Sequence, residues 1–133
     1  MTIVDSSAWA AYFNGEHTPH VARLEAALRA EEDVATLPII VTEVLQGFRS
    51  DVGFERARQL FVQLPVVEPD IEAHVRAAGL HRMLRRRGVT VRGAVDCVIA
   101  QACLDAAAEL LSPDQDFERI ARHTKLRLWR AVP

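Results

Sequence analysis

The sequence predicts an α/β fold: a three-layer α/β/α arrangement with a central parallel sheet of four to five strands. Short apolar, β-branched runs alternate along the chain with longer segments of helical periodicity. Strands that alternate with helices form parallel sheets, because each crossover helix returns the chain to the same edge. The length of 133 residues indicates one domain over residues 1–133, and an apolar half of the residues can fill one core.

The first half of the chain is expected to contain two strands and four helices. Ser6 and Ser7 are good caps for a helix that Asn14-Gly15 ends, and Pro38 opens another helix at its first position. Val21, Leu24 and Leu28 mark one face of an amphipathic helix. The expected elements are a strand at 2–5, helices at 8–13 and about 19–31, a strand at 34–37, a helix from 38 and a helix at about 53–64.

The second half continues the alternation. A long helix from about residue 70 should end at Gly88, and a helix over 94–107 is apolar nearly all round, which predicts burial at the domain centre. Residues 126–129 alternate like an edge strand. The expected elements are a strand at 65–68, a helix at about 70–87, a loop at 89–93, a helix at 94–107, a strand at 109–112, a helix at 117–123 and a strand at 126–129.

Composition excludes some functions. The net charge of −2 argues against an overall electrostatic grip on nucleic acid, so any such binding needs a local basic patch. Cys97 and Cys103 lie six apart in one predicted helix, which is typical of small buried residues in a reducing compartment. The N-terminus has no basic leader and no long apolar stretch, so we expect a cytoplasmic protein that does not cross a membrane.

Several acidic residues stand where a carboxylate is costly. Asp5 ends the first apolar run, Glu43 interrupts an apolar stretch, and Asp96 is the sole charge between Gly93 and Leu104. Asp114 follows the run Leu110-Leu111-Ser112-Pro113, with Asp116 two residues on. A carboxylate among apolar residues must be paired, hydrogen-bonded or bound to metal, because uncompensated removal from water costs several kcal/mol. These acids therefore need an explanation.

The predicted topology brings these acids toward one cleft. Asp5 and Asp114 follow strands, and ligands of parallel sheets gather outside the carboxyl ends of the strands. Glu43 and Asp96 lie near helix N-termini that should face the same edge. Hard cations such as Mg²⁺ and Mn²⁺ prefer oxygen ligands, and the absence of histidine and cysteine from the set argues against zinc. The sequence predicts a Mg²⁺ or Mn²⁺ site.

The order and spacing of the acids resemble those of the PIN-domain ribonucleases, and the Arg-Gly-Val segment before Asp96 looks most like the VapC toxins of bacterial toxin–antitoxin pairs. The resemblance covers essentially the whole chain. It is carried by Ile3-Val4-Asp5-Ser6-Ser7, by Thr42-Glu43-Val44, by Gly93-Ala94-Val95-Asp96-Cys97-Val98-Ile99-Ala100 and by Leu111-Ser112-Pro113-Asp114-Gln115-Asp116-Phe117.

The resemblance implies a metal-dependent endoribonuclease of the bacterial cytoplasm. It implies that Asp5, Glu43 and Asp96 are the core metal-binding acids, and Asp114 is our choice as the fourth, with Asp116 able to serve instead or as well. The hydroxyl of Ser112 would orient a carboxylate or a water. The resemblance also implies a homodimer and a cognate antitoxin of the VapB type whose tail wraps the toxin.

Simpler interpretations stay open for each acid. Asp5 is also a good helix cap, Glu43 would suit the exposed face of an amphipathic helix, and Asp96 in a first helical turn suits the helix dipole. Asp114 and Asp116 would also suit an ordinary turn. The alternative function is a non-catalytic PIN-like module that binds a protein partner. A phosphatase with an Asp5 nucleophile ranks low, because that chemistry wants a second acid at the next position but one.

The densest basic patch is Arg82-Met83-Leu84-Arg85-Arg86-Arg87, with Arg92 further on. Arginines in a last helical turn suit the helix dipole, so a solvated helix end is one interpretation. The other is contact with the phosphate backbone of RNA, carried by Arg86 and Arg92 toward Asp96. The sequence leaves both open.

Overall fold

A four-stranded parallel sheet forms the centre of the computed structural model, which describes residues 1–132. The strand order is β2-β1-β3-β4, with β1 at Thr2–Val4, β2 at Val34–Ala35, β3 at Glu109–Leu111 and β4 at Arg127–Leu128. Ile3 of β1 pairs with Ala35 on one side and with Leu110 on the other. The sheet confirms the predicted α/β class and parallel topology.

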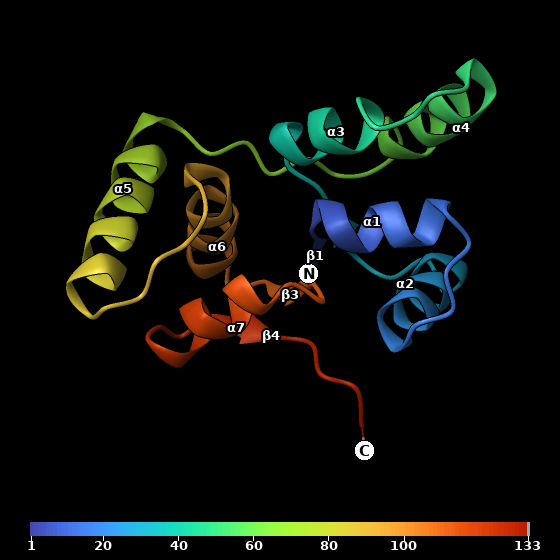
Figure 1. Cartoon of the computed structure of the whole chain (residues 1–133). Coiled ribbons are helices and arrows are strands. Elements are labelled where there is room, and N and C mark those ends of the chain that lie inside the picture. Colours follow the sequence, from blue (N-terminus) through green and yellow to red (C-terminus); the bar gives the residue numbers. More distant parts are fainter. Residues whose placement is uncertain (133) are drawn as a thin grey trace.

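Helices cover both sides of this sheet, which gives the three layers (Figure 1). In Figure 1, α1 and α2 lie on one side of the strands and α5 and α6 on the other. Helix α1 packs against α2 and α3, and α5 packs against α6. The helices are α1 at Ser6–Phe13, α2 at Pro19–Arg29, α3 at Pro38–Leu45, α4 at Asp51–Phe61, α5 at Ile71–Arg86, α6 at Ala94–Ala106 and α7 at Gln115–Arg122.

The predicted strand at 65–68 is wrong as an element. Within the described residues this segment makes one isolated bridge, between Thr36 and Val66. Pro65 has no N–H to donate to a ladder, and Pro69 follows closely, so pairing cannot extend in either direction. Val66 remains 54% exposed, which removes the burial that would favour a strand.

Helix boundaries differ from the predicted ones where a side chain caps an earlier turn. The helix predicted at 53–64 begins at Asp51, because Ser50 Oγ accepts a hydrogen bond from the Gly53 N–H at 3.0 Å. The helix predicted at 117–123 begins at Gln115, because the Asp114 carboxylate accepts from the Asp116 N–H. Both caps shift the start of the helix toward the N-terminus.

The core surrounds β1 and β3 and reaches α6. Trp9, Phe117 and Ile99 are among the largest fully buried side chains. Both cysteines of α6 are buried and free, and burial raises the pKa of Cys97 to about 11 and that of Cys103 to about 12. They are therefore protonated, unreactive core residues at neutral pH.

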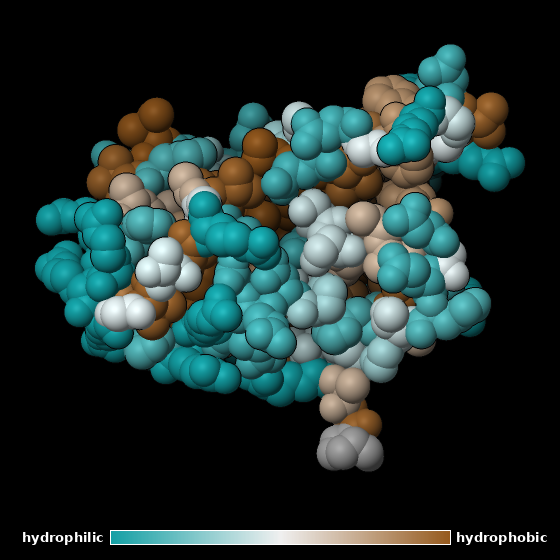
Figure 2. Space-filling model, viewed as in Figure 1, coloured by the Kyte–Doolittle hydropathy of each residue, from teal (hydrophilic) through white to brown (hydrophobic). Residues whose placement is uncertain are grey.

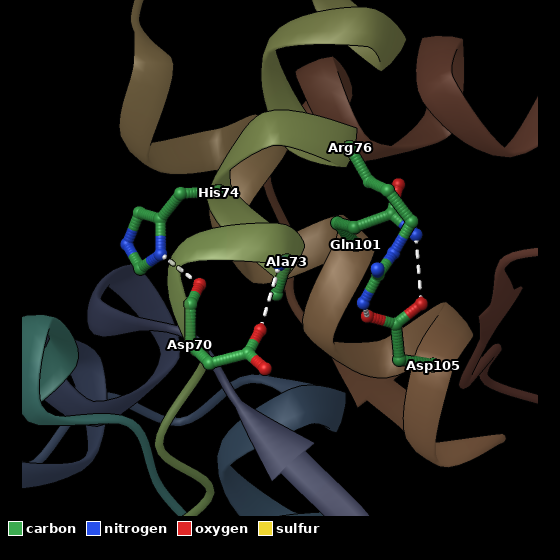
Figure 3. Close-up of polar contacts among 6 residues, drawn as sticks. All are labelled: Asp70, Ala73, His74, Arg76, Gln101 and Asp105. Atoms are coloured by element: carbon green, nitrogen blue, oxygen red, sulfur yellow. Dashed lines mark hydrogen bonds and ion pairs between the residues drawn. The ribbon is translucent and has the colours of Figure 1, made fainter.

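A polar network joins α5 to the end of α6 (Figure 3). Arg76 Nη2 donates to Asp105 Oδ2 at 2.7 Å, and Gln101 Nε2 donates to Asp105 Oδ1 at 2.9 Å. Asp70 caps α5 by accepting a hydrogen bond from the Ala73 N–H at 2.8 Å. Of these contacts, the Arg76–Asp105 pair joins α5 to α6, the helix that carries Asp96. Within residues 1–132, no helix has both the length and the apolar character needed to cross a membrane.

Stability should depend on the aromatic core far more than on this surface network. We expect Trp9→Ala to lower the free energy of unfolding by about 3–5 kcal/mol, because a fully buried ring leaves a cavity. Arg76→Ala should cost less than about 1 kcal/mol, because the Arg76–Asp105 pair is partly exposed. Urea unfolding of both variants measures the difference, and equal losses would contradict this account of the core.

Candidate active site

Asp5 lies at the carboxyl end of β1, beside the end of β3. Its backbone N–H donates to the Leu111 carbonyl at 3.1 Å, which continues the pairing of the two strands. The residue is 3% exposed, and its Oδ1 accepts from the Ala8 N–H at 3.1 Å at the start of α1. Ser7 Oγ lies 3.0 Å from both carboxylate oxygens. Asp5 therefore does cap a helix, while it also faces the sheet edge.

The turn after β3 carries Ser112, Asp114 and Asp116. Ser112 Oγ accepts a hydrogen bond from the Asp114 N–H at 3.0 Å. Asp114 Oδ1 accepts from the Asp116 N–H at 2.9 Å and so caps α7. These bonds fix the backbone of the turn, and they hold both carboxylates close to the sheet edge.

Helix α6 brings Asp96 to the same edge. Asp96 lies in the first turn of α6, and one carboxylate oxygen each from Asp96, Asp114 and Asp116 lie within 4.8 Å of one another. Asp96 and Asp114 are half-buried, and Asp116 is buried. Glu43 is half-buried near the end of α3 rather than near its N-terminus, yet its charge still acts on Asp96.

The carboxylates disfavour one another's charge. Burial raises the pKa of Asp96 to about 6, and the charges of Asp114, Asp116, Asp5 and Glu43 add to this rise in decreasing order. Burial also raises the pKa of Asp5 to about 6. Hydrogen bonds from Ala8, Ser112 and Ser7 oppose this second rise, and the Asp114 charge reinforces it. Of the sequence-predicted acids, Asp96, Asp114 and Asp116 therefore cluster, while Asp5 and Glu43 lie outside the 4.8 Å cluster and act on Asp96 through their charge.

Two arginines face Asp116 from different elements. Arg119 Nη1 donates to Asp116 Oδ1 at 2.5 Å, and Arg92 Nε lies 3.5 Å from Oδ2. Oδ2 is buried and has no hydrogen-bond partner among the described residues. Arg119 is not among the residues predicted from the sequence, although its position three residues after Asp116 in a helix is a pairing signal.

The other predicted basic residue lies apart from the acids. Arg86 is exposed in the last turn of α5, where its Nε donates to the Arg82 carbonyl at 3.4 Å. Among residues 1–132 it makes no ion pair with the acid cluster. Its position favours the interpretation of a solvated helix end, whereas Arg92 lies at the site.

An open cavity of about 450 Å³ adjoins the acids. Its wall combines two carboxylates with two guanidinium groups, so a ligand there meets both signs of charge. The lining residues are Thr90, Arg92, Asp114, Gln115, Asp116 and Arg119. An anionic chain bridged to the carboxylates by a cation would fit this arrangement.

The donor set fits a hard divalent cation. The clustered ligand atoms of Asp96, Asp114 and Asp116 are all carboxylate oxygens, the type that Mg²⁺ and Mn²⁺ prefer. The buried Oδ2 of Asp116 lacks a hydrogen bond, and the repulsion at Asp96 would be relieved by positive charge.

Removing the Asp96 charge should stabilise the cation-free chain at neutral pH. The folded-state pKa is raised to about 6 from 3.8, so ionisation is penalised once the pH rises through that value. Asp96→Asn should gain about 1 kcal/mol at about pH 7.5 in EDTA, after allowance for solvent screening, and almost nothing at about pH 4.

Urea unfolding at both pH values checks this. Asp105→Asn is the matched control on the same helix, because pairing with Arg76 lowers the pKa of Asp105 and its loss should not stabilise. A lower stability of Asp96→Asn at neutral pH would contradict the account of repulsion.

The chain matches known proteins over nearly its whole length. The PIN domain family model matches residues 2–123. Ribonuclease VapC11 of Mycobacterium tuberculosis and VapC ribonuclease Mb1587 of Mycobacterium bovis are each 34% identical to the chain over 131 residues, covering 96% of both chains.

Solved structures share the fold at low sequence identity. FitAcB of Neisseria gonorrhoeae gives a TM-score of 0.77 at 16% identity, covering 98% of this chain and 97% of that one. VapBC2 of Rickettsia felis, bound to a DNA fragment from its promoter, gives 0.76 at 17% identity, covering 96% of each. By its family match and its relatives, the chain belongs to the PIN-domain family, within the group of VapC ribonucleases.

Proposed function

We propose that this chain is an endoribonuclease toxin that hydrolyses RNA phosphodiester bonds with Mg²⁺ or Mn²⁺. The observation that carries the proposal is the cluster of Asp96, Asp114 and Asp116, whose carboxylate oxygens lie within 4.8 Å of one another at the sheet edge that also carries Asp5. Relatives that share a third of the sequence over nearly the full length are named ribonucleases, which supports the activity. The whole chain acts as one domain in the bacterial cytoplasm.

Four acids carry the chemistry in this proposal: Asp5, Glu43, Asp96 and Asp114. They hold the cation, which when bound stabilises charge on the phosphate and makes water more acidic. Ser112 orients Asp5, in keeping with the hydrogen bond that lowers the Asp5 pKa. Asp114 is the fourth acid because it has no arginine partner among the described residues, whereas Asp116 is paired with Arg119. Asp116 contributes through Oδ2 alone.

Arg92 contacts the RNA backbone in this proposal, and Arg86 is the weaker candidate. Arg92 is 84% exposed beside the acids and lines the adjoining cavity. A guanidinium there meets phosphates that approach the cation. Arg86 reaches RNA only if the substrate extends along the end of α5.

Cleavage of RNA tests the central proposal. Purified chain free of other proteins should cut total cellular RNA at discrete sites with Mg²⁺ or Mn²⁺, and EDTA should abolish the cuts. Asp5→Asn and Asp96→Asn should each lose activity by about 100-fold or more, because the metal supplies several kcal/mol of transition-state stabilisation. Circular dichroism should show both variants folded.

Asp105→Asn is the matched control, since it removes an α6 carboxylate that is paired with Arg76 away from the cluster. Full activity of Asp5→Asn or Asp96→Asn would overturn the assignment. A chain that neither cleaves RNA nor binds the cation by calorimetry would support the alternative of a non-catalytic protein-binding module.

The proposal includes two protein partners, a cognate VapB-type antitoxin and a second copy of the chain. The antitoxin surface is formed by the half-buried rings of Tyr12, Phe13 and Phe48, which pack over the buried Trp9 and Phe61, and α4 extends it with the exposed side chains of Val52 and Phe54. The rings pack within about 6 Å of one another, as in Phe13–Phe48 at 5.4 Å. An amphipathic antitoxin segment would bury the apolar atoms left exposed there.

The second copy covers a different face. Ile71 and Val75 stand one turn apart on α5 and are 77% and 58% exposed. A mostly apolar cavity of about 380 Å³ lies nearby, lined by Ile39, His74 and Val98 among others. Figure 2 shows hydrophobic residues over the start of α5 and over α3. Contiguous exposed apolar surface of this kind marks protein interfaces.

Substitutions at two exposed valines, Val52 and Val75, distinguish the two proposed interfaces. Light scattering should give wild type twice the 14.8 kDa chain mass, and Val75→Arg should give a monomer, because a charge at a buried interface is unpaired. Val52→Arg should keep the dimer and weaken antitoxin binding, measured by calorimetry. Each variant is thus the control for the other, and a dimeric Val75→Arg would exclude the α5 face.

A further inference from the structure

Asp116 fixes the guanidinium group of Arg119 at the wall of the cavity. The two residues lie one turn apart on α7, and Arg119 Nη1 donates to Asp116 Oδ1 at 2.5 Å. The Asp116 side chain is 5% exposed, whereas the Arg119 side chain is 47% exposed. A buried anchor therefore holds a guanidinium whose other N–H donors have no hydrogen-bond partner among residues 1–132.

The two arginines of this wall, Arg92 and Arg119, balance the two acids that line it, Asp114 and Asp116. Arg119 and Arg92 both face the single carboxylate of Asp116, and Arg92 is 84% exposed. One arginine would neutralise the buried acid, so the second is not needed for that purpose. Asp96 and Asp114 lie within 4.8 Å of Asp116, so the positive group directly adjoins the acids proposed to hold the cation.

The cavity shows which ligand suits this arrangement. Its space of about 450 Å³ is lined by both arginines together with Asp114 and Asp116. A guanidinium presents paired N–H donors that match the oxygens of a phosphate, and an anchored guanidinium loses less freedom on binding. A polyanion crossing the cavity would meet the cation on one side and Arg119 on the other.

We propose that Arg119 is a phosphate-binding residue for the RNA substrate and that Asp116 is the residue that positions it. This inference rests on the proposed ribonuclease function. Arg119 takes a backbone phosphate next to the one that is cleaved, and the Asp116 carboxylate keeps the guanidinium turned toward the RNA. Asp116 therefore belongs mainly to substrate binding, with Oδ2 left to face the cation.

Binding of RNA without cation tests Arg119 directly. The probe is a short fluorescein-labelled single-stranded RNA in EDTA, and its affinity is measured by anisotropy over a series of salt concentrations. Arg119→Gln should weaken binding about tenfold, the value of one charge-assisted hydrogen bond. The slope of log affinity against log salt should shrink by about 0.7, as expected for one phosphate contact on a single strand.

The matched control is Arg122→Gln, which removes an exposed arginine from the same helix without touching the cavity lining. It should change neither affinity nor slope beyond a general charge effect. The RNA affinity of Arg119→Lys should lie between those of wild type and Arg119→Gln, because lysine keeps the positive charge but lacks the paired N–H donors of a guanidinium group. Equal behaviour of Arg119→Gln and Arg122→Gln would overturn the proposal.

Asp116→Asn separates positioning from general electrostatics. Loss of a negative charge beside RNA should by itself strengthen RNA binding. Asp114→Asn is the control for this effect: it keeps a side chain that can cap α7, and it should bind RNA more tightly than wild type. Asp116→Asn should instead weaken binding in EDTA, because Arg119 loses its anchor. Stronger binding by both variants would sink the positioning role.

Kinetics with Mg²⁺ or Mn²⁺ keep this inference apart from the proposed function. Arg119→Gln should raise KM more than it lowers kcat, because the contact lies outside the reacting atoms. Wild type that binds RNA but never cuts it would refute the ribonuclease function. The role of Arg119 in RNA binding would then be judged by the anisotropy data alone. Wild type that cuts RNA while Arg119→Gln matches Arg122→Gln would refute the inference alone.

Discussion

Parallel pairing of β1 with β3 is the constraint on which the rest of the molecule depends. The two strands end at the same edge, so Asp5 emerges beside Ser112 and the turn that carries Asp114. Neither strand is longer than three residues, yet both are buried in the middle of the sheet. Helix α1 begins right after β1, and α7 begins after the short turn at 112–114 that follows β3, so the capping residues of both helices lie near the same sheet edge. A register slip of one residue would move every one of these side chains.

The carboxylates at the sheet edge destabilise the folded chain when they are ionised. Burial at the sheet edge, reinforced by neighbouring carboxylates, raises the pKa of Asp5 and Asp96, and the hydrogen bonds at Asp5 only partly offset this rise. The buried aromatic and aliphatic core around Trp9 and Phe117 supplies the stability that tolerates the strain. Arg119 relieves part of the repulsion through Asp116 and leaves Oδ2 without a hydrogen bond. A site that favours a cation is therefore prepared before any cation arrives.

Much of this architecture could be predicted from the sequence, because alternation of strands and helices fixes a parallel sheet and its ligand-binding edge. The acids could be singled out because Glu43 and Asp96 interrupt apolar runs, and Asp5 and Asp114 stand at the ends of predicted strands. The segment at 65–68 has the apolar pattern of a strand but makes only an isolated bridge within the described residues. The pattern alone does not show that the flanking prolines prevent further pairing. Arg119 was missed because exposed arginines are common, and only the burial of Asp116 distinguishes this one. Local sequence also does not show that Arg92, and not Arg86, lies beside Asp116 in space.

Two of the site acids serve the scaffold as well as the cleft. Asp5 accepts the Ala8 amide at the start of α1, and Asp114 accepts the Asp116 amide at the start of α7. Alanine at either position would remove a helix cap worth about 1 kcal/mol together with the carboxylate. A loss of activity could then come from lower stability or from the missing carboxylate, and the two causes would not be separated. Asparagine keeps the cap and removes only the charge. Where selection for activity is lost but selection for folding remains, these two positions should change mainly to asparagine, serine or threonine, which still cap a helix. Such a bias would distinguish an inactive but folded protein from a gene under no selection.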